Sequence, residues 1–555
     1  MDPEELAYGL GLAGVDPASL GAALAKVALQ LARRPAQLLR GLGELALAEA
    51  SVAFDVSRLL LGSPDPPVTA PDPSDRRFGD RAWKENPLLR GALGSYLVSS
   101  RWAQKMLEKA DVPAQVRRKA KFALDVALDA AAPSNVPWLN PSAVKELVDT
   151  GGLSAWRGLG NLADDLVNNR AQPRQFEPDA FELGSTLAAT PGRVVYRNDL
   201  MELIAYEPQT DTVFEQPILY SPAWINKYYV LDLAPDRSFI EHAVRAGFTV
   251  FAISYRNPDP SMADLRLDDY LRDGLLAGLE QAATLTGSPV VNIVAVCIGG
   301  TLAMMGLGTL AARGEAERVG WAALTVTLVD YSEPGAIGAF ADEQTLARIE
   351  RRNARRGYLS AGDLSAPFTL MRGNELFWNY VVSNWYMGRK PPAFDILAWN
   401  ADSTRLPALM HSQFLRACYL ENRLTQPGAF EIDGTAVDLS QVQTPLYVLG
   451  AENDHIALWR GVYRTTQLVG GPSRFVLTSG GHIAGMVNPP GKKNARHFVN
   501  DVPPPDPDQW LAGAKRVDGS WWEDWVAWAA ARSGARVAPP HLPEGTPAPG
   551  EYVRG

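Results

Sequence analysis

The sequence predicts an α/β fold preceded by a helical region, and three observations support this prediction. From about residue 190 onward, short β-rich runs alternate with helical stretches, which is typical of a mostly parallel sheet with helices on both faces. Before that point, apolar residues recur at helical spacing. Within the alternating part, one strand–turn–helix stretch carries a cysteine at its turn, and the rest of the chain is interpreted around it.

The composition narrows the class of protein. The chain has 555 residues, enough for two or three domains, with 46% hydrophobic and 21% charged residues, as in ordinary globular proteins. A net charge of −9 argues against a nucleic-acid partner. Its two cysteines, Cys297 and Cys418, exclude a disulfide framework and a multi-cysteine zinc site, so no metal is expected.

The same features predict a cytoplasmic location. A low cysteine content fits a reducing compartment. The acidic start, residues 1–5, lacks the basic beginning of a signal peptide. No apolar run is long enough to span a bilayer, so no membrane span is expected.

Residues 1–190 are predicted to form a helical N-terminal domain. Apolar residues recur at helical spacing over residues 18–61, where Pro35 is expected to start a second helix. The Pro- and Asp-rich stretch 62–73 is interpreted as a linker. Residues 74–185 continue the helical pattern, with expected aromatic anchors at Phe78, Trp83, Trp102 and Trp138.

Residues 191–555 are predicted to form the α/β domain. Helical stretches at 237–246 and 265–286 separate some of its β-rich runs. The expected strands are Arg193–Tyr196, Leu203–Tyr206, Ile218–Tyr220, Thr249–Ser254, Val290–Val296, Leu324–Val329, Leu446–Leu449 and Phe475–Thr478.

Two later stretches depart from this alternation. Residues 333–439 are helical and rich in aromatic residues, and we interpret them as an insertion that caps the carboxyl edge of the sheet. Near the end, Ser520 is a suitable N-cap for a helix whose tryptophans pack into the core. Residues 539–550 are expected to form an extended tail.

The stretch Val291–Thr301 reads as a buried strand, a sharp turn and the start of a helix. Cys297 stands at the turn and is followed by Ile298, Gly299 and Gly300. This arrangement predicts the nucleophile elbow of the α/β-hydrolase fold, in which small residues flank a nucleophile held on a strained turn. The helix that begins there directs amide groups and a positive dipole end at the nucleophile, which favours a thiolate.

A lone cysteine at the end of an apolar strand is more often an ordinary core residue. The two glycines and the following helix favour the nucleophile instead. A catalytic cysteine also needs a histidine base and an orienting carboxylate, which follow the nucleophile in the order acid, histidine in this fold. His482 follows an expected strand within Ser-Gly-Gly-His, and Asp454 follows the expected strand before it.

The expected oxyanion donors are backbone amides. One is the amide of Ile298, directly after the nucleophile. The second is expected from the loop after an earlier strand, as the amide of Ala223 or Trp224. His455, next to Asp454, is a possible supporting residue that holds the loop by hydrogen bonding.

With these residues in place, the chain resembles the polyhydroxyalkanoate synthases, especially the single-subunit class I type. The resemblance runs through most of the chain after about residue 70. The stretches that carry it are Asp75-Arg-Arg-Phe with Trp83, Asn226-Lys-Tyr-Tyr-Val-Leu-Asp-Leu, Tyr255-Arg-Asn-Pro-Asp, Cys297-Ile-Gly-Gly-Thr, Asn379-Tyr-Val-Val, Asp454-His-Ile, Gly481-His-Ile-Ala-Gly, Asn488-Pro-Pro, Trp510-Leu-Ala-Gly-Ala and Ser520-Trp-Trp-x-x-Trp.

The resemblance implies polymerisation of (R)-3-hydroxyacyl-CoA into a polyester with release of coenzyme A. It places the nucleophile on Cys297, the acid on Asp454 and the general base on His482, with Asn226 as a further possible supporting residue. It also implies a homodimer on the surface of cytoplasmic polymer granules. No cofactor is implied, because the CoA thioester is the substrate.

Two positions depart from the family pattern. Ala295 replaces the first glycine of the elbow, and Ala223-Trp224 replaces a pair that is usually smaller. Two other readings therefore stay open. One is a cysteine-dependent acyl-CoA thioesterase or acyltransferase with the same three residues, and the other is an inactive granule-associated scaffold.

Overall fold

The structure is a computed structural model that divides into two compact units, each described here by itself. The described residues are 16–62, 66–73, 75–501 and 503–555. Unit 1 comprises residues 1–177 and 362–393, and unit 2 comprises residues 178–361 and 394–555. The acidic start on which the signal-peptide expectation rests lies outside the described residues, as does part of the expected linker, residues 63–65.

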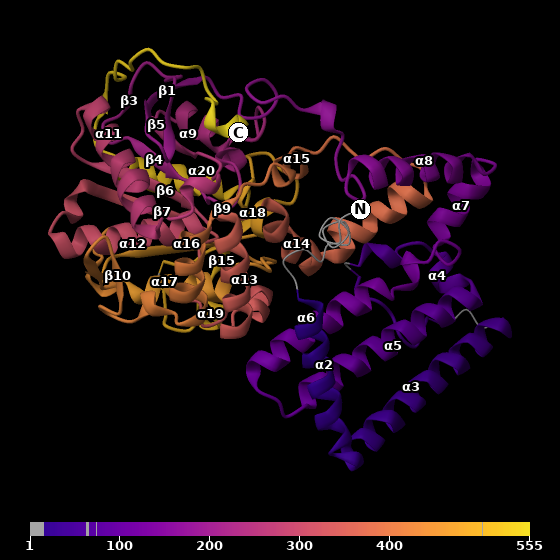
Figure 1. The fold of residues 1–555 in the computed structure, drawn as a ribbon. Coiled ribbons are helices and arrows are strands. Elements are labelled where there is room, and N and C mark those ends of the chain that lie inside the picture. The colour runs from indigo at the N-terminus through magenta and orange to yellow at the C-terminus, as the bar shows by residue number, and fades with distance from the viewer. Residues whose placement is uncertain (1–15, 63–65, 74, 502) are drawn as a thin grey trace. The chain divides into compact units, whose positions relative to one another are not determined.

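Unit 1 is helical, as expected for the N-terminal region (Figure 1). The second helix begins at Pro35, as predicted. Helix α3 packs along α5, and α2 packs along α6. The helices before residue 177 are α2 (Pro17–Ala32), α3 (Pro35–Leu60), α4 (Ala82–Glu85), α5 (Pro87–Lys109), α6 (Ala114–Ala130), α7 (Pro141–Asp149) and α8 (Leu153–Asn168).

Close packing holds α3 against α5. A Cβ placed on Gly94 of α5 would lie 2.7 Å from a methyl group of Val52 on α3, so only glycine fits there. A buried ion pair joins the same two helices, with Arg90 Nε donating to Asp55 Oδ2 at 2.7 Å. Asn86 caps α5 by accepting hydrogen bonds from two of its first amides.

Residues 362–393 belong to unit 1 although they lie within the insertion expected at 333–439. They contain most of α14 (Ala361–Met371) and two π-helical segments, η9 (Asn374–Trp378) and η10 (Val381–Tyr386). The carbonyl of Trp385 lies so close to α8 that a Cβ on Gly158 would be 1.9 Å from its oxygen. Trp385 Nε1 also donates to Asp165 Oδ2 at 2.8 Å, so the segment is bound to α8 by both packing and hydrogen bonding.

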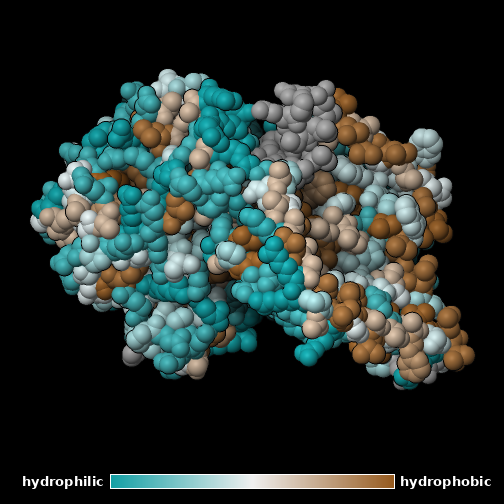
Figure 2. Space-filling model, turned by 60° about the horizontal axis from the view of Figure 1, so that its bottom comes forward, coloured by the Kyte–Doolittle hydropathy of each residue, from teal (hydrophilic) through white to brown (hydrophobic). Residues whose placement is uncertain are grey.

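Unit 1 exposes many apolar side chains. Among the expected aromatic anchors, Phe78 and Trp83 are buried. The prediction that Trp138 is an anchor is wrong, because 76% of this residue is exposed. Figure 2 shows apolar residues gathered over part of one face. The exposed apolar side chains on and next to α7 and α8 are Trp138, Val144, Leu147, Val148, Leu153, Trp156, Leu159, Leu166 and Val167.

Unit 2 is built on a ten-stranded mixed sheet in the order β1-β2-β5-β4-β6-β7-β12-β13-β14-β15. Strands β5, β4, β6, β7, β12 and β13 are parallel, and the strands at both ends are antiparallel. Their bounds are β1 (Gly192–Arg197), β2 (Met201–Tyr206), β4 (Ile218–Ser221), β5 (Val250–Tyr255), β6 (Val291–Val296), β7 (Val319–Thr325), β12 (Leu446–Ala451), β13 (Ser473–Thr478), β14 (Arg496–Val499) and β15 (Lys515–Asp518).

The strand order places helices on both faces of the sheet. The chain runs from β4 through α9 (Phe239–Arg245) to β5, then back past β4 through α11 (Ala277–Thr286) to β6. Because both crossovers are right-handed, α9 and α11 cover opposite faces. Helix α12 (Ile298–Arg313) follows β6 and covers the face of α11, while α20 (Trp521–Ala530) packs on Phe239 of α9.

One expected strand is misplaced. The apolar run Leu324–Val329 was predicted as a strand, but β7 ends at Thr325 and begins five residues before that run, at Val319. Val326 has a φ of 45°, which ends the strand, and the following residues are buried as a loop. The residues after Thr325 are buried like a strand but do not form one, so their apolar sequence led to a predicted strand that is too long at this end.

The last predicted elements of unit 2 are confirmed. Ser520 caps α20 by accepting a hydrogen bond from the amide of Trp522. The extended tail runs along the free edge of β1, where the amide of Val194 donates to the carbonyl of Thr546 at 2.8 Å. This pairing protects an edge that is otherwise open to association.

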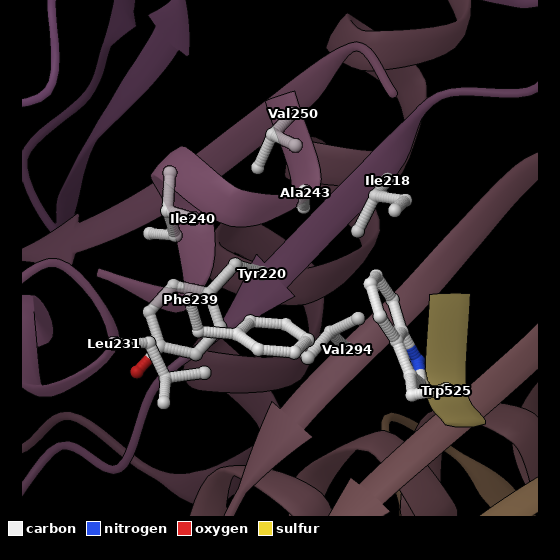
Figure 3. A pocket seen from close by; sticks show the side chains of 9 residues that line it. All are labelled: Ile218, Tyr220, Leu231, Phe239, Ile240, Ala243, Val250, Val294 and Trp525. Atoms are coloured by element: carbon white, nitrogen blue, oxygen red, sulfur yellow. The ribbon is translucent and has the colours of Figure 1, made fainter. Parts of the chain in front are cut away.

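The core beneath the sheet contains a small apolar cavity (Figure 3). Its volume of about 10 Å³ is at the limit for a single water molecule. The side chains around it include Tyr220, Phe239 and Trp525, and all of them come from the core between α9, α20 and the sheet. The cavity is therefore a packing defect and not a substrate site.

Candidate active site

The three predicted catalytic residues lie at the carboxyl ends of parallel strands in one sheet. Cys297 follows β6, Asp454 follows β12, and His482 follows β13. In parallel sheets the carboxyl ends of the strands form one edge, where the loops that bind ligands gather. The fold thus brings residues separated by up to 185 positions to a common edge, since 482 minus 297 is 185.

Cys297 occupies a strained turn between β6 and α12. Its φ of 51° and ψ of −125° lie outside the regions that ordinary side chains adopt. Its amide donates to the carbonyl of Thr325 at 2.9 Å, and its carbonyl accepts from Thr327 Oγ1 at 3.1 Å. These bonds from the neighbouring loop hold the turn in place.

The two glycines after Cys297 are required by close approach. A Cβ on Gly299 would lie 2.4 Å from the carbonyl oxygen of Pro222, and one on Gly300 would lie 2.0 Å from Thr327 Oγ1. No side chain fits at either position. Ala295, two residues before Cys297, is fully buried in β6, so its methyl group is accommodated within the sheet.

His482 and Asp454 form a buried pair. His482 Nδ1 lies 2.7 Å from Asp454 Oδ2. The other carboxylate oxygen, Oδ1, accepts hydrogen bonds from the amides of Ile456 and Ala457, at 2.9 and 3.0 Å. The aspartate is thereby fixed by its own loop, and it orients the imidazole so that Nε2 is the ring nitrogen left for chemistry.

The surroundings of His482 favour its protonated form. Burial alone would lower its pKa, but the Asp454 carboxylate and then Cys297 outweigh this effect, so the pKa rises to about 10. The influence of Cys297 on this pKa means that its sulfur lies near the imidazole. A histidine that keeps its proton at neutral pH is the partner that a thiolate requires.

The two expected oxyanion donors lie on either side of the turn. Ile298 is the first residue of α12, and the first amides of a helix have no acceptor within that helix. The loop after β4 passes directly over Gly299, as the contact with Pro222 shows. Within this loop, the carbonyl of Trp224 accepts from Thr404 Oγ1 at 2.8 Å, which fixes the backbone that carries the second candidate amide.

The expected supporting residues have different surroundings. Asn226 pairs through its backbone with Ser403, so it ties the loop after β4 to the insertion. His455 is adjacent to Asp454, whose carboxylate is bound by the amides of Ile456 and Ala457 and by the His482 ring. A role for either side chain in the chemistry stays a prediction.

Sequence reasoning missed two tyrosines beside the nucleophile. The hydroxyl of Tyr331 lies 2.9 Å from Thr301 Oγ1, one helical turn after Cys297. The rings of Tyr331 and Tyr419 are 4.6 Å apart. Burial and then the charge of Cys297 raise the pKa of Tyr419. Tyr331 follows the loop after β7, and Tyr419 lies in the π-helical segment Leu415–Leu420, so no local pattern marked either as a functional position.

The described residues contain no group of three or more His, Cys, Asp and Glu side chains arranged to hold a metal ion. Across the described ranges, no helix is both long enough and apolar enough to cross a membrane.

Comparison with known families gives two matches that overlap along the chain. Residues 74–243 match the profile of the N-terminus of poly-beta-hydroxybutyrate polymerase (PhaC). Residues 217–489 match the profile of the alpha/beta hydrolase fold. The second match spans the sheet from β4 to β13 and agrees with the strand order described above.

Several proteins are similar to this chain over most of its length. Poly(3-hydroxyalkanoate) polymerase 2 of Ectopseudomonas oleovorans is 41% identical over 504 residues, which cover 90% of this chain and 89% of that protein. Poly(3-hydroxyalkanoate) polymerase subunit PhaC of Cupriavidus necator is 40% identical over 494 residues, covering 86% and 83%. Poly(3-hydroxyalkanoate) polymerase of Methylorubrum extorquens is 38% identical over 540 residues, covering 96% and 89%.

Solved structures are less similar. A putative lipase of Acinetobacter baumannii AYE has a TM-score of 0.31 and 11% identity, covering 54% of this chain and 88% of that chain. At this level the likeness carries no argument, so the fold is assigned from the strand order and the family match.

Proposed function

The chain belongs to the poly(3-hydroxyalkanoate) polymerase family, and on that premise we propose that it polymerises (R)-3-hydroxyacyl-CoA into polyhydroxyalkanoate with release of coenzyme A. The observation that carries this proposal is the identity of 41% to a named polymerase over 90% of the chain. The catalytic assignment is supported by geometry, since Cys297 stands on a strained turn beside the buried pair His482–Asp454.

In the first half-reaction, the Cys297 sulfur attacks the thioester carbonyl carbon of the substrate. A new C–S bond forms, the bond to the coenzyme A sulfur breaks, and His482 gives its proton to the departing thiolate. The acyl group then remains on Cys297 as a thioester. Because thioester exchange is nearly balanced in free energy, the bound acyl group stays activated for the next transfer, whereas a serine ester would be a more stable trap.

Charge develops on the substrate oxygen during this attack. The Ile298 amide and the amide of Ala223 or Trp224 are the proposed donors to that oxygen, because their loops flank the nucleophile turn. Fixed amide donors need no reorganisation during the reaction, and each is worth about 10²–10³-fold in rate.

Chain elongation requires a base. The 3-hydroxyl of one unit attacks the acyl carbon that another unit holds in thioester linkage. Its proton passes to the base as the C–O bond forms, and the C–S bond of that thioester breaks to release the thiolate. We assign this role to His482, with Asp454 as its positioning residue. We prefer His482 to Asp454 as the base because both carboxylate oxygens of Asp454 already have partners. One oxygen contacts His482, and the other accepts hydrogen bonds from two backbone amides.

The finer biological setting belongs to the same proposal. We propose a cytoplasmic homodimer attached to the surface of polymer granules. The exposed apolar side chains on α7 and α8, such as Trp156 and Val167 with 75% and 81% exposed, support contact with an apolar polyester.

A cysteine-dependent thioesterase is the second candidate, because it would use the same three residues. The deciding experiment measures coenzyme A release from (R)-3-hydroxybutyryl-CoA by the wild type and by Cys297→Ala, with the product sized. Polyester of high mass from the wild type alone supports the polymerase. Release with only free hydroxyacid supports the thioesterase, and no release by either protein supports the inactive scaffold.

A further inference from the structure

Five aromatic side chains form a continuous row beside the nucleophile, which we name the aromatic row. Its order follows from the distances between ring centroids. Trp224 lies 5.5 Å from Tyr270 and 5.7 Å from Phe414. Phe414 in turn lies 6.1 Å from Tyr331 and 5.9 Å from Tyr419. The row therefore runs from Tyr270 through Trp224 and Phe414 to Tyr331 and Tyr419.

Two members of the aromatic row are tied to the nucleophile turn. The loop that carries Trp224 passes over Gly299, two residues after Cys297. Tyr331 is hydrogen-bonded to Thr301 on the first turn of α12. The row thus stands over the start of the helix that follows the nucleophile.

The chemistry of the row suits an alkyl group. The hydroxyl of Tyr331 is already engaged by Thr301, so this residue offers its ring and not a polar group. Trp224 and Phe414 present rings as well, and both are buried, with 3% and 5% exposed. In a (R)-3-hydroxyacyl group bound to Cys297, the part that needs such surroundings is the alkyl side chain on the third carbon.

Trp224 is the member of the row that fills the most space. Its ring lies between Tyr270 and Phe414. Thr404 holds its backbone at the same time, which leaves the indole little freedom to move aside. Close-packed aromatic rings of this kind do not yield to an extra methylene without strain.

We propose that the indole of Trp224 sets the upper limit on the length of the acyl side chain, so that the enzyme prefers short (R)-3-hydroxyacyl-CoA substrates. The inference rests on the proposed function, because it concerns the same reaction at Cys297. Trp224 acts here through the space that it occupies next to Phe414, independently of any hydrogen bond from its amide.

The test compares two substrates in one enzyme. The ratio of kcat/KM for (R)-3-hydroxyoctanoyl-CoA to kcat/KM for (R)-3-hydroxybutyryl-CoA is measured by coenzyme A release in the wild type, Trp224→Leu and Trp224→Ala. We expect the ratio to rise at least about tenfold in both variants, because hydrophobic sites discriminate by roughly 10–200-fold per methylene. Trp224→Leu retains part of the packing and is measured even where Trp224→Ala fails to fold.

A matched control separates specificity from general destabilisation. Trp510 is also fully buried in unit 2, among Phe475 and Tyr463, away from the three catalytic residues. Trp510→Leu is expected to lower the melting temperature while leaving the ratio within twofold of the wild-type value.

The possible outcomes distinguish the two proposals. A wild type that releases no coenzyme A from either substrate overturns the proposed function and this inference with it. An active wild type whose ratio stays within twofold in folded, active Trp224→Leu overturns the inference alone. An equal rise of the ratio in Trp510→Leu also overturns it, because the effect then reflects loosened packing.

Discussion

The two units treat apolar surface in opposite ways. Every exposed large hydrophobic side chain in the described residues lies in unit 1, with three exceptions in unit 2: Phe394, Val517 and Val537. Unit 2 buries its aromatic residues around the sheet and holds Cys297 on a turn with a φ of 51°. A catalytic site requires a rigid interior from which water is excluded. Binding to an apolar surface requires exposed apolar side chains that are not buried in the protein's own core.

The two units are not two consecutive halves of the chain. Residues 362–393 leave the α/β unit, pack with α8 and return. The helical unit therefore holds a piece of the insertion by Gly158, Asp165 and Asn161. A change on α8 is expected to act on that piece directly, while a change at the sheet edge acts on chemistry.

The largest expected effect is on chemistry in unit 2. His482→Gln removes the proposed base, and we expect coenzyme A release to fall about 10⁴-fold in a protein that still folds, with a lowered melting temperature because the buried Asp454 carboxylate loses its partner. The matched control is His242→Gln on α9, where the histidine packs against Trp522 away from the catalytic residues. Retention of more than a tenth of the activity in His482→Gln would refute the assignment of the base.

The next effect concerns stability and its dependence on pH. The pKa of His482 is raised to about 10 in the folded protein, from an ordinary value of 6.5, chiefly by Asp454. The stabilisation is therefore fully present below pH 6.5 and is lost as the pH rises towards 10. We expect Asp454→Asn to lower the free energy of unfolding by about 3 kcal/mol at pH 6, because it breaks a buried pair.

Chemical denaturation at a series of pH values checks this expectation. The difference between the wild type and Asp454→Asn should shrink steadily from pH 6 to pH 10. A difference that stays constant across that range would mean that the pair contributes through packing and not through charge.

A smaller effect is expected where unit 1 holds the segment 362–393. A Cβ on Gly158 would meet the carbonyl oxygen of Trp385 at 1.9 Å, and a backbone atom cannot move aside as a side chain can. We expect Gly158→Ala to destabilise unit 1 by about 2 kcal/mol. Hydrogen exchange should also become faster within residues 374–386.

Gly160 provides the control for this substitution. It lies on the same helix, and a Cβ there would meet no atom within 4 Å. Gly160→Ala is expected to stabilise α8 by about 0.5–1 kcal/mol, since alanine is the better helix former. Equal effects of the two substitutions would contradict the tight packing of α8 on Trp385.

The smallest effect on stability is expected at the exposed apolar side chains of unit 1. The double variant Trp156→Ser and Val167→Ser should unfold within about 0.5 kcal/mol of the wild type. Its binding to amorphous polyester particles should fall about tenfold or more, because a large apolar side chain such as valine contributes about 1.5–3 kcal/mol when it is buried. Val537→Ser, which alters an exposed apolar residue of unit 2, should leave binding unchanged.

Sequence reasoning succeeded where a local pattern has a physical cause. The elbow was predictable because a strained turn between a strand and a helix admits only small neighbours, and Gly299 and Gly300 carry that requirement. Asp454 and His482 were predictable from their order and from the strands before them. Their 2.7 Å contact agrees with this expectation, although their roles in catalysis stay predictions.

The misses have physical reasons as well. The buried loop after Thr325 is as apolar as a strand, so hydropathy extended β7 past its end. Strands β14 and β15 form a partly exposed antiparallel edge with a polar sequence, which offers no apolar pattern. The packing of Trp385 on α8 and the place of Tyr331 depend on contacts distant in the sequence, which periodicity does not report.

The route of the chain has a consequence for the order of events on the ribosome. Unit 1 lacks its last segment until residue 393 has been synthesised, and by then the strands from β1 to β7 have already been made. At about 5–20 residues per second, roughly 10–40 s separate the emergence of α8 from that of Trp385. During this interval the nascent helical unit exposes the surface around Gly158 and Asp165. Unit 1 can therefore be completed only after much of unit 2 has been synthesised, because residues 362–393 follow that part of the chain.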